Sequence, residues 1–390
     1  MTDLERILAL WRDLEAACAD YVLATVVEVQ GPSYRKPGAL MLLTADGRRA
    51  GTVSGGCLEA EVASRAWWLT ANGPTIQRYS TAEDDGDRPF GSGCGGVVFL
   101  LLERSTTAAP LLRALEKAFT QRIALGVATA LDGMQIGRRA FAGIQELPSR
   151  QVEASIEISP GSALALEELA QQALVQRADL GSEIEMDGRT LKAWANYRPA
   201  RPALGIFGAG DDARPLVSMA KELGWFVSLA DGRSHLASSN RFPRADRISV
   251  LRIEDLPCFP PGSSVESISH LQRHDAAVVM THSFEQDSRI LACLLSLQDP
   301  PGYIGVLGPQ RRTCELLEEA ARLLGIPSSA IANQAERWLA QLHAPTGLDL
   351  GAESPETIAL SILAEIQKFR TSASALPLCT VRAARVTQSG

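Results

Sequence analysis

Two cysteines in the first hundred residues lie in glycine-rich turns. Cys57 ends the run SGGC (54–57) between a predicted strand and a predicted helix, and Cys94 lies in GSGCGG (91–96) directly before a predicted strand. A helix N-terminus offers unpaired amides and partial positive charge, which lower the pKa of a thiol and attract anions. Glycine lets the backbone come close to a ligand. The pattern is typical of a site that combines thiolate with an amide cradle, although glycines also serve ordinary turns.

A nearby loop adds positive charge to this candidate site. Arg35 and Lys36 lie in PSYRKP (32–37), beside the end of a predicted strand. Thiolates bind soft metals or take part in sulfur chemistry, whereas backbone amides and cations hold phosphate. We therefore predict that Cys57 and Cys94 contact a metal or its sulfur, and that Arg35 and the amides of 54–57 hold an anion. A hydrolytic Cys–His pair is disfavoured, because all five histidines lie in the later half of the chain.

A second glycine turn follows a predicted strand at 203–207. Gly208, Gly210 and Ala213 fit the pattern G-x-G-x-x-A, which opens the helix of a dinucleotide-binding unit. Asp231 ends the next predicted strand, where a carboxylate can accept hydrogen bonds from ribose hydroxyls. The turn could equally serve packing alone, because Asp211 and Asp212 place negative charge where a phosphate would bind. Arg233 could accommodate the 2′-phosphate of NADP, so the choice between NAD and NADP stays open.

The predicted helices and strands that carry these residues fall into separate domains. We predict an α+β domain over 1–104, an intermediate segment or small domain over 105–200, a Rossmann-like domain over 201–370 and a loosely ordered tail over 371–390. Residues 197–202 contain two prolines and are expected to form a linker. The third region alternates apolar runs with helical stretches, which is typical of a parallel sheet covered on both faces. Its apolar runs are 203–207, 226–230, 248–251, 276–280 and 304–307.

Composition limits the classes of partner. The chain has 390 residues and a net charge of −7, which argues against nucleic acid as a partner. We find no apolar run long enough to cross a membrane and no signal-peptide core, so we expect a cytoplasmic protein. The seven cysteines are scattered without a CxxC pair, which disfavours a disulfide framework or a zinc ribbon.

Taken together, the motifs resemble the XdhC/CoxI family, the accessory proteins of xanthine dehydrogenase and related molybdenum hydroxylases. The resemblance leaves roughly residues 105–200 uncovered. In the N-terminal part it rests on GPSYRKPGALMLL (31–43), GTVSGGCLEAEV (51–62) and GCGGVVFLLLE (93–103). In the C-terminal part it rests on GIFGAGDDARPL (205–216), LADGR with RFPRAD (229–246), VVMTHSFEQD (278–287), YIGVLGPQRR (303–312) and HAPTGLDLGAESPETIALSILAEI (343–366).

The resemblance implies a chaperone without turnover that binds molybdenum cofactor in its molybdopterin form and delivers it, sulfurated, to a molybdenum hydroxylase apoenzyme. It also implies contact with a cysteine desulfurase and a homodimer. A nucleotide or NAD(P) in the Rossmann-like domain is left open. The family's functional positions fall on Arg35, Gly55, Gly56, Cys57, Glu59, Cys94, Gly208, Gly210, Asp231, His282 and Asp287.

Two other classes of function remain. An NAD(P)-dependent oxidoreductase would explain the glycine turn at 208–213, but it gives the two glycine-flanked cysteines no part. A partner that binds only the hydroxylase protein would need no cofactor site. Retention of molybdenum and pterin would separate both alternatives from the chaperone.

Overall fold

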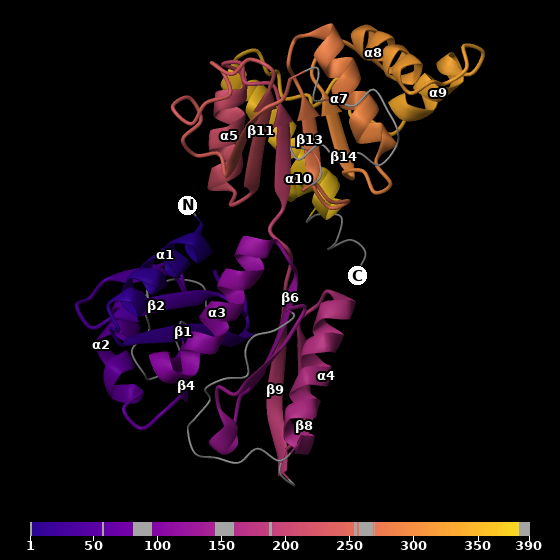
Figure 1. The fold of residues 1–390 in the computed structure, drawn as a ribbon. Coiled ribbons are helices and arrows are strands. Elements are labelled where there is room, and N and C mark those ends of the chain that lie inside the picture. Colours follow the sequence, from indigo (N-terminus) through magenta and orange to yellow (C-terminus); the bar gives the residue numbers. More distant parts are fainter. Residues whose placement is uncertain are drawn as a thin grey trace. The chain divides into compact units, whose positions relative to one another are not determined.

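The chain folds into two compact units, Met1–Arg201 and Pro202–Gly390 (Figure 1). The computed structural model describes residues 2–56, 58–80, 96–144, 160–186, 189–252, 256, 268 and 270–381. In that part of the chain, no helix is both long enough and apolar enough to cross a membrane.

The first unit begins with an antiparallel sheet of order β3-β2-β1-β5-β4 that is covered on both faces. Successive side chains of β1 point to opposite faces, so Leu23 joins the core under α1 and α3 while Ala24 joins the core under α2. The strands are β1 (Tyr21–Gln30), β2 (Leu40–Thr44), β3 (Arg49–Gly51), β4 (Thr75–Ser80) and β5 (Val97–Arg104); the helices are α1 (Asp3–Ala16), α2 (Glu59–Leu69) and α3 (Ser105–Gln121).

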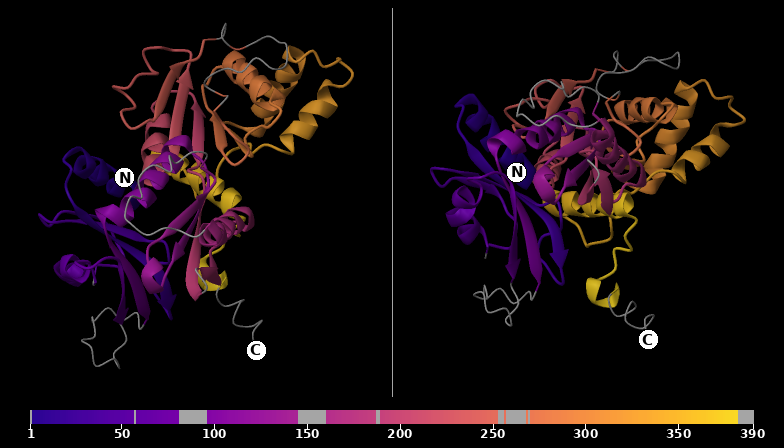
Figure 2. Two further views of the ribbon diagram at one scale, coloured as in Figure 1. Left: turned by 60° about the horizontal axis from the view of Figure 1, so that its bottom comes forward. Right: turned by 90° about the horizontal axis from the view of Figure 1, so that it is seen from below.

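A second antiparallel sheet, of order β7-β6-β9-β8, carries α4 along one face (Figures 1 and 2). An ideal Cβ at Gly126 on β6 would lie 2.1 Å from the carbonyl oxygen of Ala170, so glycine lets α4 approach closely. On the other face, Val127 joins the core of the first sheet. Its elements are β6 (Leu125–Ala130), η1 (Gly133–Gln135), β7 (Arg139–Ala142), α4 (Pro160–Gln176), β8 (Leu180–Met186) and β9 (Arg189–Arg198).

The second unit is a parallel sheet of order β12-β11-β10-β13-β14, and this confirms the predicted Rossmann-like architecture behind an α+β region. Helices α5 and α10 cover one face; α7, α8 and α9 cover the other. The strands are β10 (Ala203–Phe207), β11 (Phe226–Asp231), β12 (Arg247–Val250), β13 (Ala276–Val279) and β14 (Tyr303–Val306). The helices are α5 (Ala213–Glu222), α7 (Phe284–Ser296), α8 (Gln310–Leu323), α9 (Ile331–Leu339) and α10 (Pro355–Thr371).

The strand order reverses between β10 and β13, which are paired in parallel. Such a switch point is where open α/β sheets bind ligands, beyond the carboxyl ends of the strands. The turn at 208–213 follows β10 and the segment at 280–283 follows β13. Both predicted ligand segments of this unit therefore lie at one edge of the sheet.

The predicted linker and domain boundaries can be compared with the strands of the structure. β9 runs to Arg198, so the predicted linker at 197–202 begins inside a strand, where Tyr197 pairs with Gly126. The divisions at residues 104 and 370, including the intermediate domain and the tail, stay predictions.

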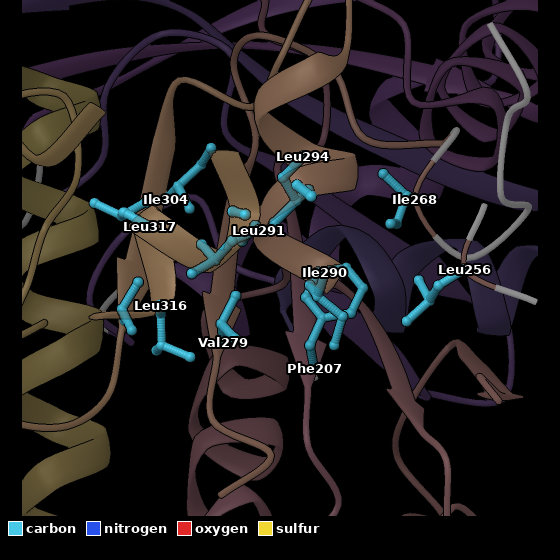
Figure 3. Packing of buried hydrophobic residues seen from close by; sticks show 14 of the residues in the cluster. Phe207, Leu256, Ile268, Val279, Ile290, Leu291, Leu294, Ile304, Leu316 and Leu317 are labelled. Atoms are coloured by element: carbon cyan, nitrogen blue, oxygen red, sulfur yellow. The ribbon is translucent and has the colours of Figure 1, made fainter. Parts of the chain in front are cut away.

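Leu291 on α7 tests the core of the second unit (Figure 3). It is fully buried among side chains of the sheet, α7 and α8. We expect Leu291→Ala to lower the free energy of unfolding of this unit by about 2–5 kcal/mol, because it removes buried methyl groups and leaves a cavity. Urea unfolding followed by tryptophan fluorescence measures this. Leu360→Ala is the control, since Leu360 on α10 is 53% exposed; an equal loss in both variants would contradict the assignment.

Candidate functional site

A serine–glutamate pair organises the turn between β3 and α2. The carboxylate of Glu59, a residue that is 1% exposed, accepts the hydroxyl of Ser54 at 2.6 Å. It also accepts the backbone N–H of Ser54 at 2.8 Å and of Val53 at 3.1 Å. The hydroxyl oxygen of Ser54 in turn accepts the N–H of Gly56 at 3.2 Å and of Leu58 at 3.1 Å. The turn is therefore held from within by Glu59 and Ser54, and the predicted contact of Glu59 with a cofactor stays a prediction.

Glu59 is ionised at neutral pH. Burial by itself opposes the charged form, but hydrogen bonds from the Ser54 side chain and from backbone amides outweigh it and hold the pKa of Glu59 below its ordinary value. The buried charge strengthens these hydrogen bonds, because charge-assisted bonds are the stronger kind. The turn is thus preorganised by an anion of its own.

The outer side of this turn is exposed backbone. Gly55 and Gly56 are exposed, and the ring of Tyr34 lies beside Gly55, with its Cγ 3.5 Å from an ideal Cβ there. Gly56 has a φ of +117°, which glycine adopts without strain, and no atom among the described residues lies within 4 Å of its ideal Cβ. Among the described residues, the backbone of Gly56 is open to a ligand, while the ring of Tyr34 covers one side of Gly55.

Arg35 fixes the loop of residues 31–38 to the rest of the first sheet. Its Nε donates to the hydroxyl of Thr52 at 2.8 Å, and its guanidinium also contacts the carboxylate of Asp3 on α1. The guanidinium lies 5.7 Å from the ring centre of Tyr34. One third of the Arg35 side chain stays exposed, so it faces both its internal partners and solvent. Its role in holding a ligand anion stays a prediction.

The start of β5 borders the same loop. An ideal Cβ at Gly96 would lie 2.1 Å from the carbonyl oxygen of Pro32 and 3.1 Å from that of Gln30. Since Gly55 meets Tyr34, the segments of both glycine motifs that the structure describes pack against residues 31–37. The convergence of Cys57 and Cys94 themselves stays a prediction.

Cys57 and Cys94 themselves lie outside the described residues. Their assignment to metal or sulfur contact stays a prediction. Among residues that the structure describes, no group of three or more His, Cys, Asp and Glu side chains could hold a metal ion.

In the second unit, the glycine turn has clear packing reasons. Gly208 has a φ of +133°, and an ideal Cβ there would lie 2.4 Å from the carbonyl oxygen of Met280. Ala213 is fully buried at the start of α5. At Gly210, an ideal Cβ would lie 2.5 Å from a carboxylate oxygen of Asp212. Glycine is therefore needed to join β10 to β13, while a carboxylate already lies over the position predicted for phosphate.

Asp231 is engaged on both oxygens. Its carboxylate accepts the N–H of Ala209 at 2.7 Å and three hydrogen bonds from the backbone and side chain of Arg233 at 2.8–2.9 Å. Burial raises the pKa of Asp231, but the hydrogen bonds from Arg233 and Ala209 together lower it by more. The pKa therefore lies below its ordinary value. Its predicted contact with ribose would compete with these partners, and stays a prediction.

His282 lies at the switch point, as its position after β13 suggested. Its Nε2 is 2.9 Å from a carboxylate oxygen of Asp212, so the pair links the segment after β13 with the turn after β10. Next to it, buried Asp287 accepts the hydroxyl of Thr281 at 2.6 Å and pairs with Arg312 at 2.7 Å. Asp212 was expected only to oppose phosphate, and Arg312 was not predicted as a site residue.

The fold and the glycine turns define a class: two-unit proteins with a C-terminal Rossmann domain. Sequence models of two families match the chain, the XdhC Rossmann domain over residues 204–366 and the XdhC and CoxI family over residues 14–80. A protein of Bacillus subtilis (strain 168), named as a probable xanthine dehydrogenase subunit, is 31% identical over 379 residues, which are 93% of this chain and 96% of that protein. The chain belongs to the XdhC and CoxI family, as the motifs predicted.

Two further relatives extend the comparison. The molybdenum cofactor insertion chaperone PaoD of Escherichia coli (strain K12) is 24% identical over 350 residues, or 90% of this chain and 83% of that protein. The crystal structure of a xanthine dehydrogenase from Bacillus halodurans superimposes with a TM-score of 0.65 at 27% identity, covering 96% of this chain and 97% of the other. The architecture is thus shared along nearly the whole chain.

The pair Ser54–Glu59 can be tested through stability. We expect Glu59→Gln to lower the free energy of unfolding of the first unit by about 1–3 kcal/mol at pH 7, because the amide is uncharged and replaces the oxygen that accepts the Ser54 hydroxyl with an NH2 donor. The folded pKa of Glu59 is depressed, so its contribution is complete above the ordinary value of 4.5 and is lost as the pH falls through the lower folded value. Urea unfolding between pH 7 and pH 3 should show the two proteins converging at the acid end.

Glu61→Gln is the matched control for this experiment. Glu61 lies two residues further along α2 and forms a surface pair with Arg65. Such pairs contribute at most about 1 kcal/mol. Equal losses in the two variants, or a difference that does not shrink in acid, would remove Glu59 from its position as organiser of the turn.

Gly208 supplies a test of the second turn. We expect Gly208→Ala to destabilise the second unit by at least about 2 kcal/mol, because the left-handed φ and the close approach to Met280 both oppose a side chain. Gly325→Ala isolates the backbone cost, since Gly325 has a φ of +70° and no described atom within 4 Å of an ideal Cβ. Thermal unfolding compares the two, and a larger loss at Gly325 would contradict the packing argument.

Proposed function

We propose that this chain is a chaperone for molybdenum cofactor, which binds the cofactor, shields it and delivers it in sulfurated form to the apoenzyme of a xanthine dehydrogenase-type molybdenum hydroxylase. The observation that carries the proposal is that the glycine segments flanking both cysteines in sequence pack against one loop, residues 31–37. The relationship to a protein named as a molybdenum cofactor insertion chaperone supports it.

The chemistry of the cargo suits the residues around this loop. Molybdopterin carries a phosphate and a soft metal bound through sulfur, so it needs a cation or amides at one end and thiolate chemistry at the other. Exposed Gly55 and Gly56 leave room for the cargo at the turn, and the partly exposed Arg35 provides positive charge. We assign the metal or its exchangeable sulfur to Cys57 and Cys94. Glu59 positions the turn through Ser54.

The partners follow from delivery. A protein that hands over sulfurated cofactor must meet the hydroxylase apoenzyme, and we propose that it also meets a cysteine desulfurase as the source of sulfur. A homodimer and a cytoplasmic location are parts of the same proposal. The proposal does not include catalytic turnover of a substrate.

The oxidoreductase alternative loses support at the switch point. Both oxygens of Asp231, the residue it needs for ribose, bind Ala209 and Arg233. The carboxylate of Asp212 lies over Gly210, where a diphosphate would approach. Neither contact favours NAD(P).

The cysteines provide the direct test. We expect Cys57→Ser and Cys94→Ser to lower the molybdenum and pterin that copurify with protein from cofactor-competent cells by at least about tenfold, because a hard hydroxyl replaces a soft ligand. Elemental analysis and pterin fluorescence after gel filtration measure this. Cys18→Ser is the matched control, since Cys18 is an exposed thiol of the same unit.

Unchanged molybdenum in folded Cys57→Ser and Cys94→Ser variants would remove both residues from the site. Absence of cofactor from the unmodified protein would favour the partner that binds hydroxylase alone. Steady oxidation of NADH or NADPH with carbonyl substrates would favour the oxidoreductase and overturn the chaperone.

A further inference from the structure

Tyr34 presents an aromatic ring beside Gly55, in the turn between β3 and α2. The residue is 72% exposed, and among the described residues its hydroxyl has no hydrogen-bond partner. An aromatic ring is a large apolar surface, and leaving it in water forgoes the stabilisation that its burial would give. The ring is therefore available to a partner from outside the described part of the chain.

Gly55 covers part of one face of this ring. An ideal Cβ at Gly55 would lie 3.5 Å from Cγ of Tyr34, 3.6 Å from Cδ1 and 3.8 Å from Cδ2. Nearly equal distances to the two Cδ atoms place that Cβ over the face of the ring rather than beyond its edge. The high exposure of Tyr34 leaves most of the remaining ring surface open.

The loop fixes the backbone around Tyr34. The hydroxyl of Ser33 donates to the carbonyl of Arg35 at 2.9 Å, which closes a tight turn over Tyr34. The side chain of Arg35 in turn donates to Thr52 at 2.8 Å and so attaches the loop to the end of β3. A ring that is already held in place loses little conformational entropy when it binds a ligand.

The proposed cargo has one part that the proposed function leaves without a partner. Its phosphate is assigned to Arg35 and the amides of 54–57, and its metal or sulfur is assigned to Cys57 and Cys94. The pterin itself is a flat heteroaromatic ring system. Aromatic side chains bind flat heterocycles by stacking, as they bind the bases of single-stranded nucleic acids.

We propose that Tyr34 stacks on the pterin of the cargo and that this contact retains the cofactor until it is delivered. Gly56, the residue after Gly55, has no described atom within 4 Å of its ideal Cβ, so cargo bound to the ring can extend over the turn. The guanidinium of Arg35 lies 5.7 Å from the ring centre and brings positive charge to the same place. This inference rests on the proposed function.

The rate at which copurified cofactor is released tests the contact. Full-length protein from cofactor-competent cells is dialysed, and the bound pterin and molybdenum are followed with time. We expect Tyr34→Leu to release both at least about tenfold faster than the unmodified protein, because stacking on one ring contributes about that factor. Tyr34→Phe keeps the ring and should release both at the unmodified rate. Trp68→Leu is the matched control, since Trp68 is 73% exposed but lies at the other end of α2.

Fluorine NMR distinguishes stacking from a purely structural role of Tyr34. The chain has five tyrosines, so the fluorotyrosine resonance that disappears in Tyr34→Phe is that of Tyr34. We expect this resonance to shift between cofactor-free and loaded protein, because a stacked heteroaromatic ring changes the magnetic field at its neighbour. Cofactor-free Tyr34→Leu should keep the thermal stability of the unmodified protein, since substitutions of exposed side chains usually change stability little.

The outcomes separate this inference from the chaperone proposal. Release at the unmodified rate from Tyr34→Leu, faster release from Tyr34→Phe, or an unchanged Tyr34 resonance on loading would overturn the stacking contact and leave the chaperone proposal standing. The exposed ring would then be assigned to a protein partner. Absence of cofactor from the unmodified protein would overturn both.

Discussion

The arrangement of the first unit depends on how closely other backbone can approach the loop of residues 31–38. Gly96 leaves no space for a Cβ against the carbonyl of Pro32, and Gly55 meets the ring of Tyr34. At the far end of the loop, an ideal Cβ at Gly38 would lie 3.0 Å from Oδ1 of Asn196 on the second sheet. A side chain at Gly96 would push the start of β5 away from the loop, whereas one at Gly38 would only press on the side chain of Asn196, and Gly55 is in ordinary van der Waals range of Tyr34. Close packing along the loop therefore links the candidate cofactor site with the second sheet.

Local signals in the sequence predicted the second unit well. The turn at 208–213 combines a buried strand, glycines at fixed spacing and a helix, and all three lie within a dozen residues. The parallel strands are short and buried on both faces, so they read as apolar runs and could be recognised without knowledge of their partners. His282 follows the apolar run 276–280, so it lies at the carboxyl edge of the sheet for the same reason. Its partner Asp212, 70 residues earlier in the chain, left no local signal.

The region at 105–200 was harder to predict because its signals are weak or nonlocal. β6 reads LGVATA and could be predicted as a strand, but its small side chains do not indicate which strands it pairs with. β9 carries Asn196 and Arg198 among apolar residues, and nothing in its local sequence indicates that these two side chains lie between the two sheets. The contact of Arg35 with Asp3 spans 32 residues and the contact of Arg139 with Glu103 spans 36. Such pairs emerge only from the packed fold.

The candidate ligand sites of the two units differ in what a ligand would meet. At the switch point of the second unit, Asp231 and Asp287 bind protein partners. Asp212 pairs with His282 through one oxygen, while its buried Oδ1 has no partner among the described residues. A ligand there would compete with these contacts. In the first unit, the glycine turn exposes backbone that its internal hydrogen bonds have already shaped. Buried unpartnered polar atoms occur in both units, so they favour neither one as the binding site. The exposed, preorganised turn is the reason to propose recognition in the first unit, even though the Rossmann domain carries the more familiar motif.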